Sequence, residues 1–232
     1  MIYFNGTALE SIAPVKIEDI RVSPITQAPV SRDRALNAGA DFIRTRDGTR
    51  TIMVTFAIIE QDYDTRQQYI EAITAWASTD KPEPMQLPYH TNKLIDVLCT
   101  SLPDPSTRQW WESRLSLTFT AYDPYFYATT EKSAECGTQF EVLGNAPPKM
   151  RIERTLAEEA EEQSYSDGVN TMTFSEIPAG DMVIDLNRQT AKVGNTSIMS
   201  AYTFGSTFLV PKTGTQTITG TGTVKWRERW KA

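Results

Sequence analysis

The segment RLSLTFTAYDPYFY, from Arg114 to Tyr127, begins as a regular strand and then stops abruptly. Leu115, Leu117 and Phe119 alternate with small polar residues, a period of two that is typical of a strand with one buried face. The Asp-Pro pair at 123–124 ends the pattern, because proline donates no ladder hydrogen bond and keeps the preceding residue extended. Three aromatic residues follow directly. An ordinary core strand with an aromatic plug would fit these residues; we interpret the segment as the last strand of a first module, after which a second begins.

Composition limits the classes of function. The 232 residues leave room for one large domain or two small ones, and 40% hydrophobic and 22% charged residues are ordinary for a soluble globular protein. The net charge is −6, and neither half is basic: 12 Lys and Arg stand against 16 Asp and Glu up to residue 128, and 11 against 13 after it. We therefore expect no nucleic-acid binding. No apolar run approaches the ~20 residues of a membrane span, so we expect no membrane insertion.

The start of the chain shows neither the basic nor the apolar region of a secretory signal. The two cysteines, Cys99 and Cys136, cannot form a disulfide framework, and neither has metal-ligating neighbours at a useful spacing. Synthesis in a reducing cytoplasm is the simplest interpretation.

The first half is predicted to contain strands and one helix. Val15–Val22 and Lys93–Leu102 are expected to be strands, and Arg50–Ile59 is a strong one because its apolar residues alternate. Asp64 is expected to cap a helix, with Gln67 three residues later as in a capping box. An apolar stripe at helical spacing follows and two prolines end it, which predicts a helix packed on a sheet.

Residues 24–49 have a different character, with two prolines, many charges and no apolar period. A connection this long without a core of its own is usually either functional or disordered. One interpretation is a solvated loop, and the other is an arm that lies on a neighbouring subunit. Arginine suits such a contact, since its planar fork pairs with carboxylates and its stem buries apolar area. The candidate contact residues are Arg32, Arg34, Arg44 and Arg46.

The second half is predicted to be all β. Residues 129–169 are expected to form a seam, with a stiff break at Asn145–Pro148 and a solvated acidic loop around Glu158–Glu162. Short strands and turns then alternate, which indicates a β-sandwich. In the last segment polar to basic residues alternate with apolar ones, and we expect Trp226 and Trp230 to be buried on the apolar side.

The sequence supports no catalytic, cofactor-binding or metal-binding residues. The single histidine, His90, belongs to no recognisable motif, and phosphate loops, nucleophile elbows and paired metal-ligand motifs are missing from the sequence. The segment KWRERWK at 225–231 interleaves basic and aromatic residues as single-strand binders do, but its alternation is better explained by a terminal strand. We therefore expect a protein that is not an enzyme and needs no cofactor. Carboxylate pairs for glycoside hydrolysis leave no signature in sequence, so a glycan-degrading enzyme stays open as an alternative.

Several segments, taken in order, resemble the distal tail proteins of siphophages, the bacteriophages with long non-contractile tails. The matching segments are Phe4-Asn5-Gly6, Gly39-Ala40-Asp41-Phe42 before the strand Arg50–Val54, the single helix, Tyr122–Tyr127, Val183–Leu186 and Trp226–Trp230. The order of the set is more specific than any one motif, and the set covers nearly the whole chain.

The resemblance implies a mainly β fold, with an N-terminal β-rich domain containing one α-helix (1–128) and a C-terminal galectin-like β-sandwich (129–232). In that family the N-terminal domains assemble into a ring, usually of six subunits, that joins the tail tube to the tail-tip baseplate and the host-adhesion apparatus. The implied partners are further copies of the chain, a tail tube protein, and a tail-tip hub or tail fibre protein. The implied location is the virion tail tip, after synthesis in the host cytoplasm. The family has no catalytic residues to carry over.

A carbohydrate-binding or adhesion module is the alternative from another class. Relatives often enlarge the second half with carbohydrate-binding insertions, and this chain has no long insertion of that kind. Trp226, Trp230, Tyr202 and Phe204 could recognise host-surface glycans if they were exposed. Oligomeric state separates the ring from this module, and stabilisation by sugars would identify the module.

Overall fold

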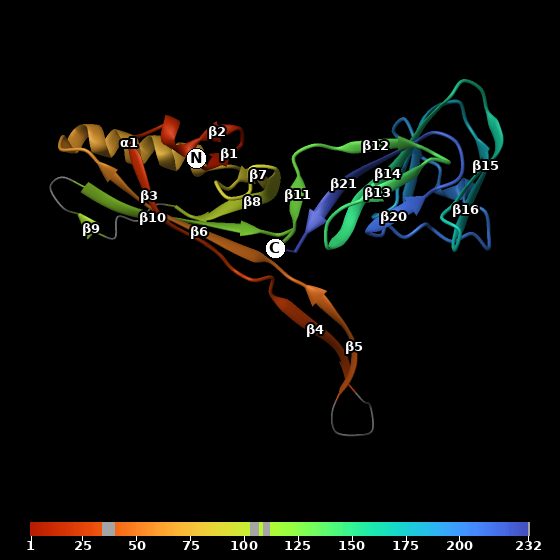
Figure 1. Ribbon diagram of the computed structural model, residues 1–232, viewed down its shortest axis with the longest axis horizontal. Coiled ribbons are helices and arrows are strands. Elements are labelled where there is room, and N and C mark those ends of the chain that lie inside the picture. The colour runs from red at the N-terminus through yellow and green to blue at the C-terminus, as the bar shows by residue number, and fades with distance from the viewer. Residues whose placement is uncertain (34–39, 103–106, 109–111, 232) are drawn as a thin grey trace. The chain divides into compact units, whose positions relative to one another are not determined.

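The computed structural model of the chain describes residues 1–33, 40–102, 107–108 and 112–231 (Figure 1). Strands dominate this part of the chain, and α1 (Tyr63–Ala77) is the one α-helix within it. The chain divides into two compact units, Met1–Phe126 with Lys231–Ala232 as unit 1, and Tyr127–Trp230 as unit 2. The prediction of a mainly β chain with one helix in its first half is confirmed.

Unit 1 is built on an antiparallel sheet with the strand order β3-β6-β10-β8. These strands are β3 (Val15–Val22), β6 (Arg50–Ile59), β8 (Lys93–Ser101) and β10 (Glu112–Ala121), and β9 (Thr107–Arg108) pairs with the start of β10. The two strongest strands of the sequence pattern, β6 and β10, pair along their whole length. Their alternating apolar residues are all buried, which confirms the predicted buried face: Ile52, Val54, Phe56, Leu115, Leu117 and Phe119.

A small group of short strands continues this sheet. β7 (Glu83–Gln86) pairs with β8, β1 (Tyr3–Phe4) pairs with β7, and β2 (Thr7–Ala8) pairs with β1 before the short helix η1 (Leu9–Ser11). Asn5 and Gly6 form the predicted turn between β1 and β2, with φ angles of 49° and 77°. These angles lie in the left-handed region, which asparagine and glycine tolerate better than other residues.

Helix α1 packs on the unit 1 sheet through the ring of Trp76. The centroid of this ring lies 5.5 Å from that of Phe4 and 6.5 Å from that of Phe119. The predicted cap at Asp64 is wrong: Asp62 is the N-cap, and its Oδ2 accepts a hydrogen bond of 2.7 Å from the backbone N–H of Thr65. Two aspartates two residues apart offer the same carboxylate, so the composition alone does not choose between them.

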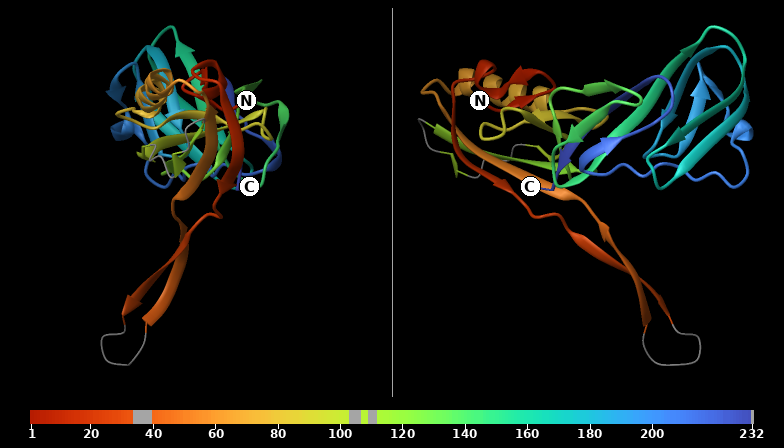
Figure 2. Two further views of the ribbon diagram at one scale, coloured as in Figure 1. Left: turned by 90° about the vertical axis from the view of Figure 1, so that its left-hand side faces the viewer. Right: turned by 45° about the vertical axis from the view of Figure 1, so that its right-hand side comes forward.

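Residues 24–49 contain two strands that the sequence pattern does not show. β4 (Gln27–Asp33) and β5 (Ala40–Asp47) pair antiparallel, and among the described residues they pair with no other strand. In Figures 1 and 2 this ribbon continues from the ends of β3 and β6 beyond the sheet of unit 1. We call β4 and β5 the arm. The interpretation as a loop is wrong for the described residues, and the contact with a neighbouring subunit stays a prediction.

Unit 2 is a sandwich of two β layers. The larger layer has the strand order β19-β18-β17-β14-β21-β12. Its strands are β12 (Lys132–Glu135), β14 (Ala146–Leu156), β17 (Gly180–Asp185), β18 (Thr190–Val193), β19 (Thr196–Ser197) and β21 (Thr223–Trp230). The other layer pairs β13 (Gln139–Val142) with β20 (Gly214–Thr217), and β15 (Ala160–Ser166) with β16 (Thr171–Ile177). The remaining elements are β11 (Phe126–Ala128) and the short helix η2 (Met199–Ala201).

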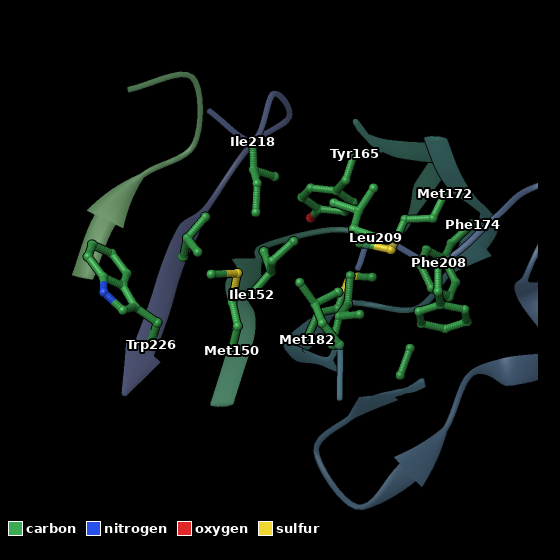
Figure 3. Packing of buried hydrophobic residues seen from close by; sticks show 14 of the residues in the cluster. Met150, Ile152, Tyr165, Met172, Phe174, Met182, Phe208, Leu209, Ile218 and Trp226 are labelled. Carbon is green, nitrogen blue, oxygen red and sulfur yellow. The ribbon is translucent and has the colours of Figure 1, made fainter. Parts of the chain in front are cut away.

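The core of unit 2 lies between these two layers (Figure 3). Met150, Ile152 and Met182 come from the larger layer, and Tyr165 and Phe174 come from the β15–β16 pair. All five side chains are buried, so both layers contribute to one continuous apolar core. The prediction of a β-sandwich in the second half is confirmed.

Two expectations for the seam are wrong. Asn145–Pro148 is not a break, because β14 begins at Ala146 and its register with β21 shifts between Ala146 and Lys149. Prolines are tolerated at such a strand start, where no ladder donor is required. The acidic run is not a loop throughout, since Glu161 and Glu162 lie in β15. Both side chains are exposed there, so the run is solvated but part of the sandwich.

Candidate functional site

Three of the four candidate arginines lie on the two strands of the arm. Arg32 is paired with Asp41, Arg44 with Val30 and Arg46 with Ala28 in the β4–β5 register. A register shift between Val30 and Ser31 marks a bulge in this ribbon. Arg34 lies outside the described residues. The structure therefore brings Arg32, Arg44 and Arg46 together on one ribbon, although 14 positions separate the first and last of them in the sequence.

The described side chains of the arm are mostly exposed. Ala28, Pro29 and Arg46 are exposed, Val30 is partly buried, and Ile43 is 57% exposed. A two-stranded ribbon by itself is at best marginally stable in water, because one pair of strands buries little apolar area. The arm is therefore suited to pack against a surface other than the described core of its own unit.

The root of the arm, where β3 leads into β4 and β5 into β6, is held by hydrogen bonds. Thr26 Oγ1 donates to the Thr49 carbonyl oxygen at 2.9 Å, and the Gly48 N–H donates to the Thr26 carbonyl oxygen at 2.7 Å. A Cβ at Gly48 would lie 2.5 Å from Thr26 Oγ1, so a side chain here would push the two segments apart. The backbones on either side of the root therefore lie close together where the arm leaves the sheet.

Asp47 fastens the root to two other segments of unit 1. Its carboxylate accepts a hydrogen bond from the Tyr125 hydroxyl and lies 3.1 Å from Lys231 Nζ. Tyr125 follows the Asp-Pro pair that ends the strand β10. The aromatic segment that closes the first half of the sequence therefore helps to hold the arm in place.

A cavity of about 380 Å³ lies beside this root. Its lining residues are Val22, Ser23, Pro24, Ile25, Arg50, His90, Phe126 and Lys231. Arg50 is only 3% exposed, and its guanidinium carbon lies 5.2 Å from the centroid of the Phe126 ring. Its Nη2 donates a hydrogen bond to the Lys231 carbonyl oxygen. Burial lowers the pKa of Arg50 below its ordinary value, yet arginine stays charged in proteins.

His90 lies in the same cavity, with its ring centroid 4.8 Å from that of Phe126. Burial lowers the pKa of His90, and the positive charges of Lys93 and Arg50 lower it further. The imidazole is therefore neutral at physiological pH. Sequence reasoning did not place Arg50 and His90 together, because 40 positions separate them and neither belongs to a motif.

The described residues form no metal-binding cluster. Among them no group of three or more His, Cys, Asp and Glu side chains could hold a metal ion. Burial raises the pKa of Cys136 to about 11, so this thiol stays protonated and unreactive at neutral pH. No helix in the described part of the chain is long and apolar enough to cross a membrane.

The two tryptophans of the last strand have different environments. Trp226 is 4% exposed and stacks on Phe140 at 4.6 Å between centroids, which confirms its predicted burial. Trp230 is only partly buried, so full burial was wrong for this residue. Glu228, which shares their parity, is 4% exposed, and its carboxylate lies 2.7 Å from Lys132 Nζ. The strand therefore buries a carboxylate, paired with the exposed Lys132, where the pattern indicated only apolar residues.

The four aromatic residues considered for glycan recognition differ in their exposure. Trp226 is buried, and Tyr202 is partly buried and stacks on Phe208 at 4.8 Å between centroids. Phe204 is fully exposed beside Gly205, whose φ is 85°. Aromatic platforms for sugars need exposed ring faces, and of the four candidates Phe204 alone is fully exposed.

No protein-family model matches the chain, and no curated protein is significantly similar in sequence. Solved structures do match. The crystal structure of SPP1 Dit (gp 19.1), described as a paradigm of the hub adsorption apparatus in Gram-positive infecting phages, is 16% identical over 98% of both chains, with a TM-score of 0.76. The baseplate of phage P2 in its activated conformation with Ca matches at 9% identity over 92% of this chain and 90% of that chain, with a TM-score of 0.45. Over nearly its whole length the chain has the fold of a phage distal tail protein, SPP1 Dit, as the sequence resemblance implied.

Proposed function

We propose that this protein is a structural subunit of a phage tail tip, where its copies form a closed ring that joins the tail tube to the baseplate and the host-adhesion apparatus. The observation that carries the proposal is the match of the complete fold, both units included, to SPP1 Dit, which is described as a paradigm of the hub adsorption apparatus. The role is structural and not enzymatic. Six subunits are the number that the resemblance implies.

The arm gives this proposal a physical basis. A cyclic ring needs a heterologous contact, in which one patch on each subunit meets a different patch on the next. The arm lies outside the sheet of its own unit, and its described side chains are mostly exposed. It can therefore pack on a neighbour without disturbing its own core. The contact residues in this proposal are Arg32, Arg34, Arg44 and Arg46.

The test is the oligomeric state of the purified chain. Light scattering coupled to size exclusion, with negative-stain images, should show rings over a range of concentrations or after addition of the tail tube and tail-tip proteins of the same phage. A chain that stays monomeric under all these conditions would overturn the proposal. A sugar that raises the melting temperature of a monomer would instead identify an adhesion module.

A further inference from the structure

Arg50 is a buried cation that the described residues leave incompletely paired. Its Nη2 donates to a backbone carbonyl, and its Nε has no hydrogen-bond partner in the described part of the chain. Burial lowers its pKa. A buried charge is strongly unfavourable unless it is paired and hydrogen-bonded. The guanidinium can therefore accept an anionic partner that the described residues do not supply.

The surroundings of Arg50 define the anion's chemistry. Val22, Pro24, Ile25 and Phe126 make apolar walls, and Lys231 and His90 add basic groups to the same cavity. Asp47, which lies at the root of the arm, is engaged by Lys231 and by the Tyr125 hydroxyl. A volume of about 380 Å³ is within the usual range of ligand sites. An occupant with an apolar stem and a carboxylate end fits both the walls and the charge.

We propose that this cavity receives a glutamate or aspartate side chain from a second copy of this chain, with Arg50 as the anchor for its carboxylate. The proposal rests on the proposed ring. Arg50 and a carboxylate can form charge-assisted hydrogen bonds, and buried arginines are frequent energetic centres of interfaces. The chain carries a net charge of −6, so a second copy offers many carboxylates. Ser23, Pro24 and Ile25 line the cavity and lead into the arm, so one neighbour can cover both.

A purely internal role for Arg50 makes a different prediction. As a brace, Arg50 would only hold Lys231 through its carbonyl oxygen and stack on Phe126. A brace has no affinity for an added carboxylate. Binding of a small carboxylate by the wild-type protein therefore separates the two roles.

The first experiment uses His90 as the reporter, because it is the only histidine in the chain. The probes are N-acetylglutamate methylamide and its glutamine counterpart, which differ only in the side-chain carboxylate. The glutamate probe should shift the His90 ring signals saturably in NMR and raise the His90 pKa, since a bound carboxylate offsets the charges that lower it. The glutamine probe should do neither. Equal responses, or none, would overturn the site.

The second experiment measures assembly. Arg50→Met keeps the stem and removes the charge, and it should raise the protein concentration needed for half-maximal ring formation at least tenfold. Arg21→Met removes an exposed arginine of unit 1 and should leave that concentration unchanged. If Arg50→Met does not fold, Arg50→Lys keeps the charge without the fork and should weaken assembly less. Excess glutamate probe should inhibit ring formation by the wild type.

The outcomes separate the two proposals. The wild type could bind the glutamate probe while ring formation changes neither with Arg50→Met nor with added probe. That result would overturn the second copy as the occupant. If rings form but the His90 signals do not respond to the glutamate probe, the cavity is not a carboxylate site, and the proposed function still stands. A wild type that never forms rings would overturn the proposed function and its occupant, while the His90 titration still decides whether the cavity binds a carboxylate.

Discussion

The β4–β5 arm and the β15–β16 pair are both two-stranded antiparallel sheets, each with seven residues in its first strand, but they differ in what covers them. The β15–β16 pair buries Tyr165, Met172 and Phe174 against the larger layer of unit 2. The described side chains of the arm have no such cover, and Ile43 is more than half exposed. One pair is stabilised by its own chain, whereas the described side chains of the other lack such cover, which is why we propose that a neighbouring subunit supplies it.

The largest effect is expected from reversing the charge of the arm. The quadruple change of Arg32, Arg34, Arg44 and Arg46 to Glu should abolish ring formation at moderate salt, and the circular dichroism of the monomer should not change. Each exposed pair contributes only about 0.2–1 kcal/mol, so single changes should have little effect. Light scattering measures assembly, and the quadruple change to Lys is the matched control. Rings formed by the Glu variant would show that the arm is not the contact.

The second prediction compares how much the two strand pairs contribute to the stability of the monomer. Phe174→Ala should lower the free energy of unfolding by about 3–5 kcal/mol, because it opens a cavity between the two layers of unit 2. Ile43→Ala in the arm should change it by no more than about 0.5 kcal/mol, since this side chain is exposed. Urea unfolding measured at low protein concentration gives both values. Similar losses in the two variants would mean that the arm packs on its own chain.

The third prediction concerns Glu153, whose two basic partners, Arg151 and Lys225, belong to its own unit. Arg151 Nε lies 2.6 Å from a Glu153 oxygen, and Lys225 Nζ lies 2.7 Å from the other oxygen. The hydrogen bond from Lys225, and then that from Arg151, lower the pKa of Glu153 below its ordinary value of 4.5. The stabilisation is therefore complete above the unfolded-state pKa and is lost as the pH falls through the lower folded-state pKa.

Glu153→Gln should accordingly lower the melting temperature at pH 7. The difference from wild type should shrink as the pH falls below about 4.5 and vanish below the folded-state pKa of Glu153. Melting curves from pH 7 to pH 3 measure this. A difference that stays constant over the whole range would show that the pair is not the cause.

The smallest effect is expected at the start of helix α1. This helix belongs to neither strand pair and therefore serves as a baseline. Asp62→Ala should lower the melting temperature slightly, because it removes the side-chain acceptor for the Thr65 N–H at the start of α1. Asp64→Ala should lower it less. A larger loss for Asp64→Ala would return the cap to the residue that the sequence pattern indicated.

The sequence predicted the elements whose apolar residues follow a clear period. β6 and β10 alternate and bury one face, so their positions followed from the pattern, and the turn at Asn5-Gly6 followed from its φ requirements. The arm could not be predicted in this way, because a ribbon without a core has no apolar face to mark its strands. Glu228 was missed for a related reason: its partner Lys132 lies 96 residues away, so nothing local shows that a carboxylate is tolerated inside.

The arginines were proposed as contact residues from their type and density, and their role stays a prediction. The register of the ribbon that carries Arg32, Arg44 and Arg46 came from the structure. The cavity beside them was not predictable, because Arg50, His90, Phe126 and Lys231 come from four separate segments. Only the three-dimensional fold shows that a buried cation, an imidazole and an aromatic ring line one cavity.

The contact between Arg50 and the Lys231 carbonyl also has a consequence for the timing of assembly. The two residues are 181 positions apart, so a growing chain exposes the arm long before it can complete its root. At synthesis rates of about 5–20 residues per second, this interval lasts roughly 10–40 s. During that time one wall of the cavity is missing from every nascent chain. A chain that already includes Lys231 can therefore be distinguished from a shorter nascent chain at the surface proposed to join subunits, and this difference would protect neighbouring nascent chains on one polysome from premature association.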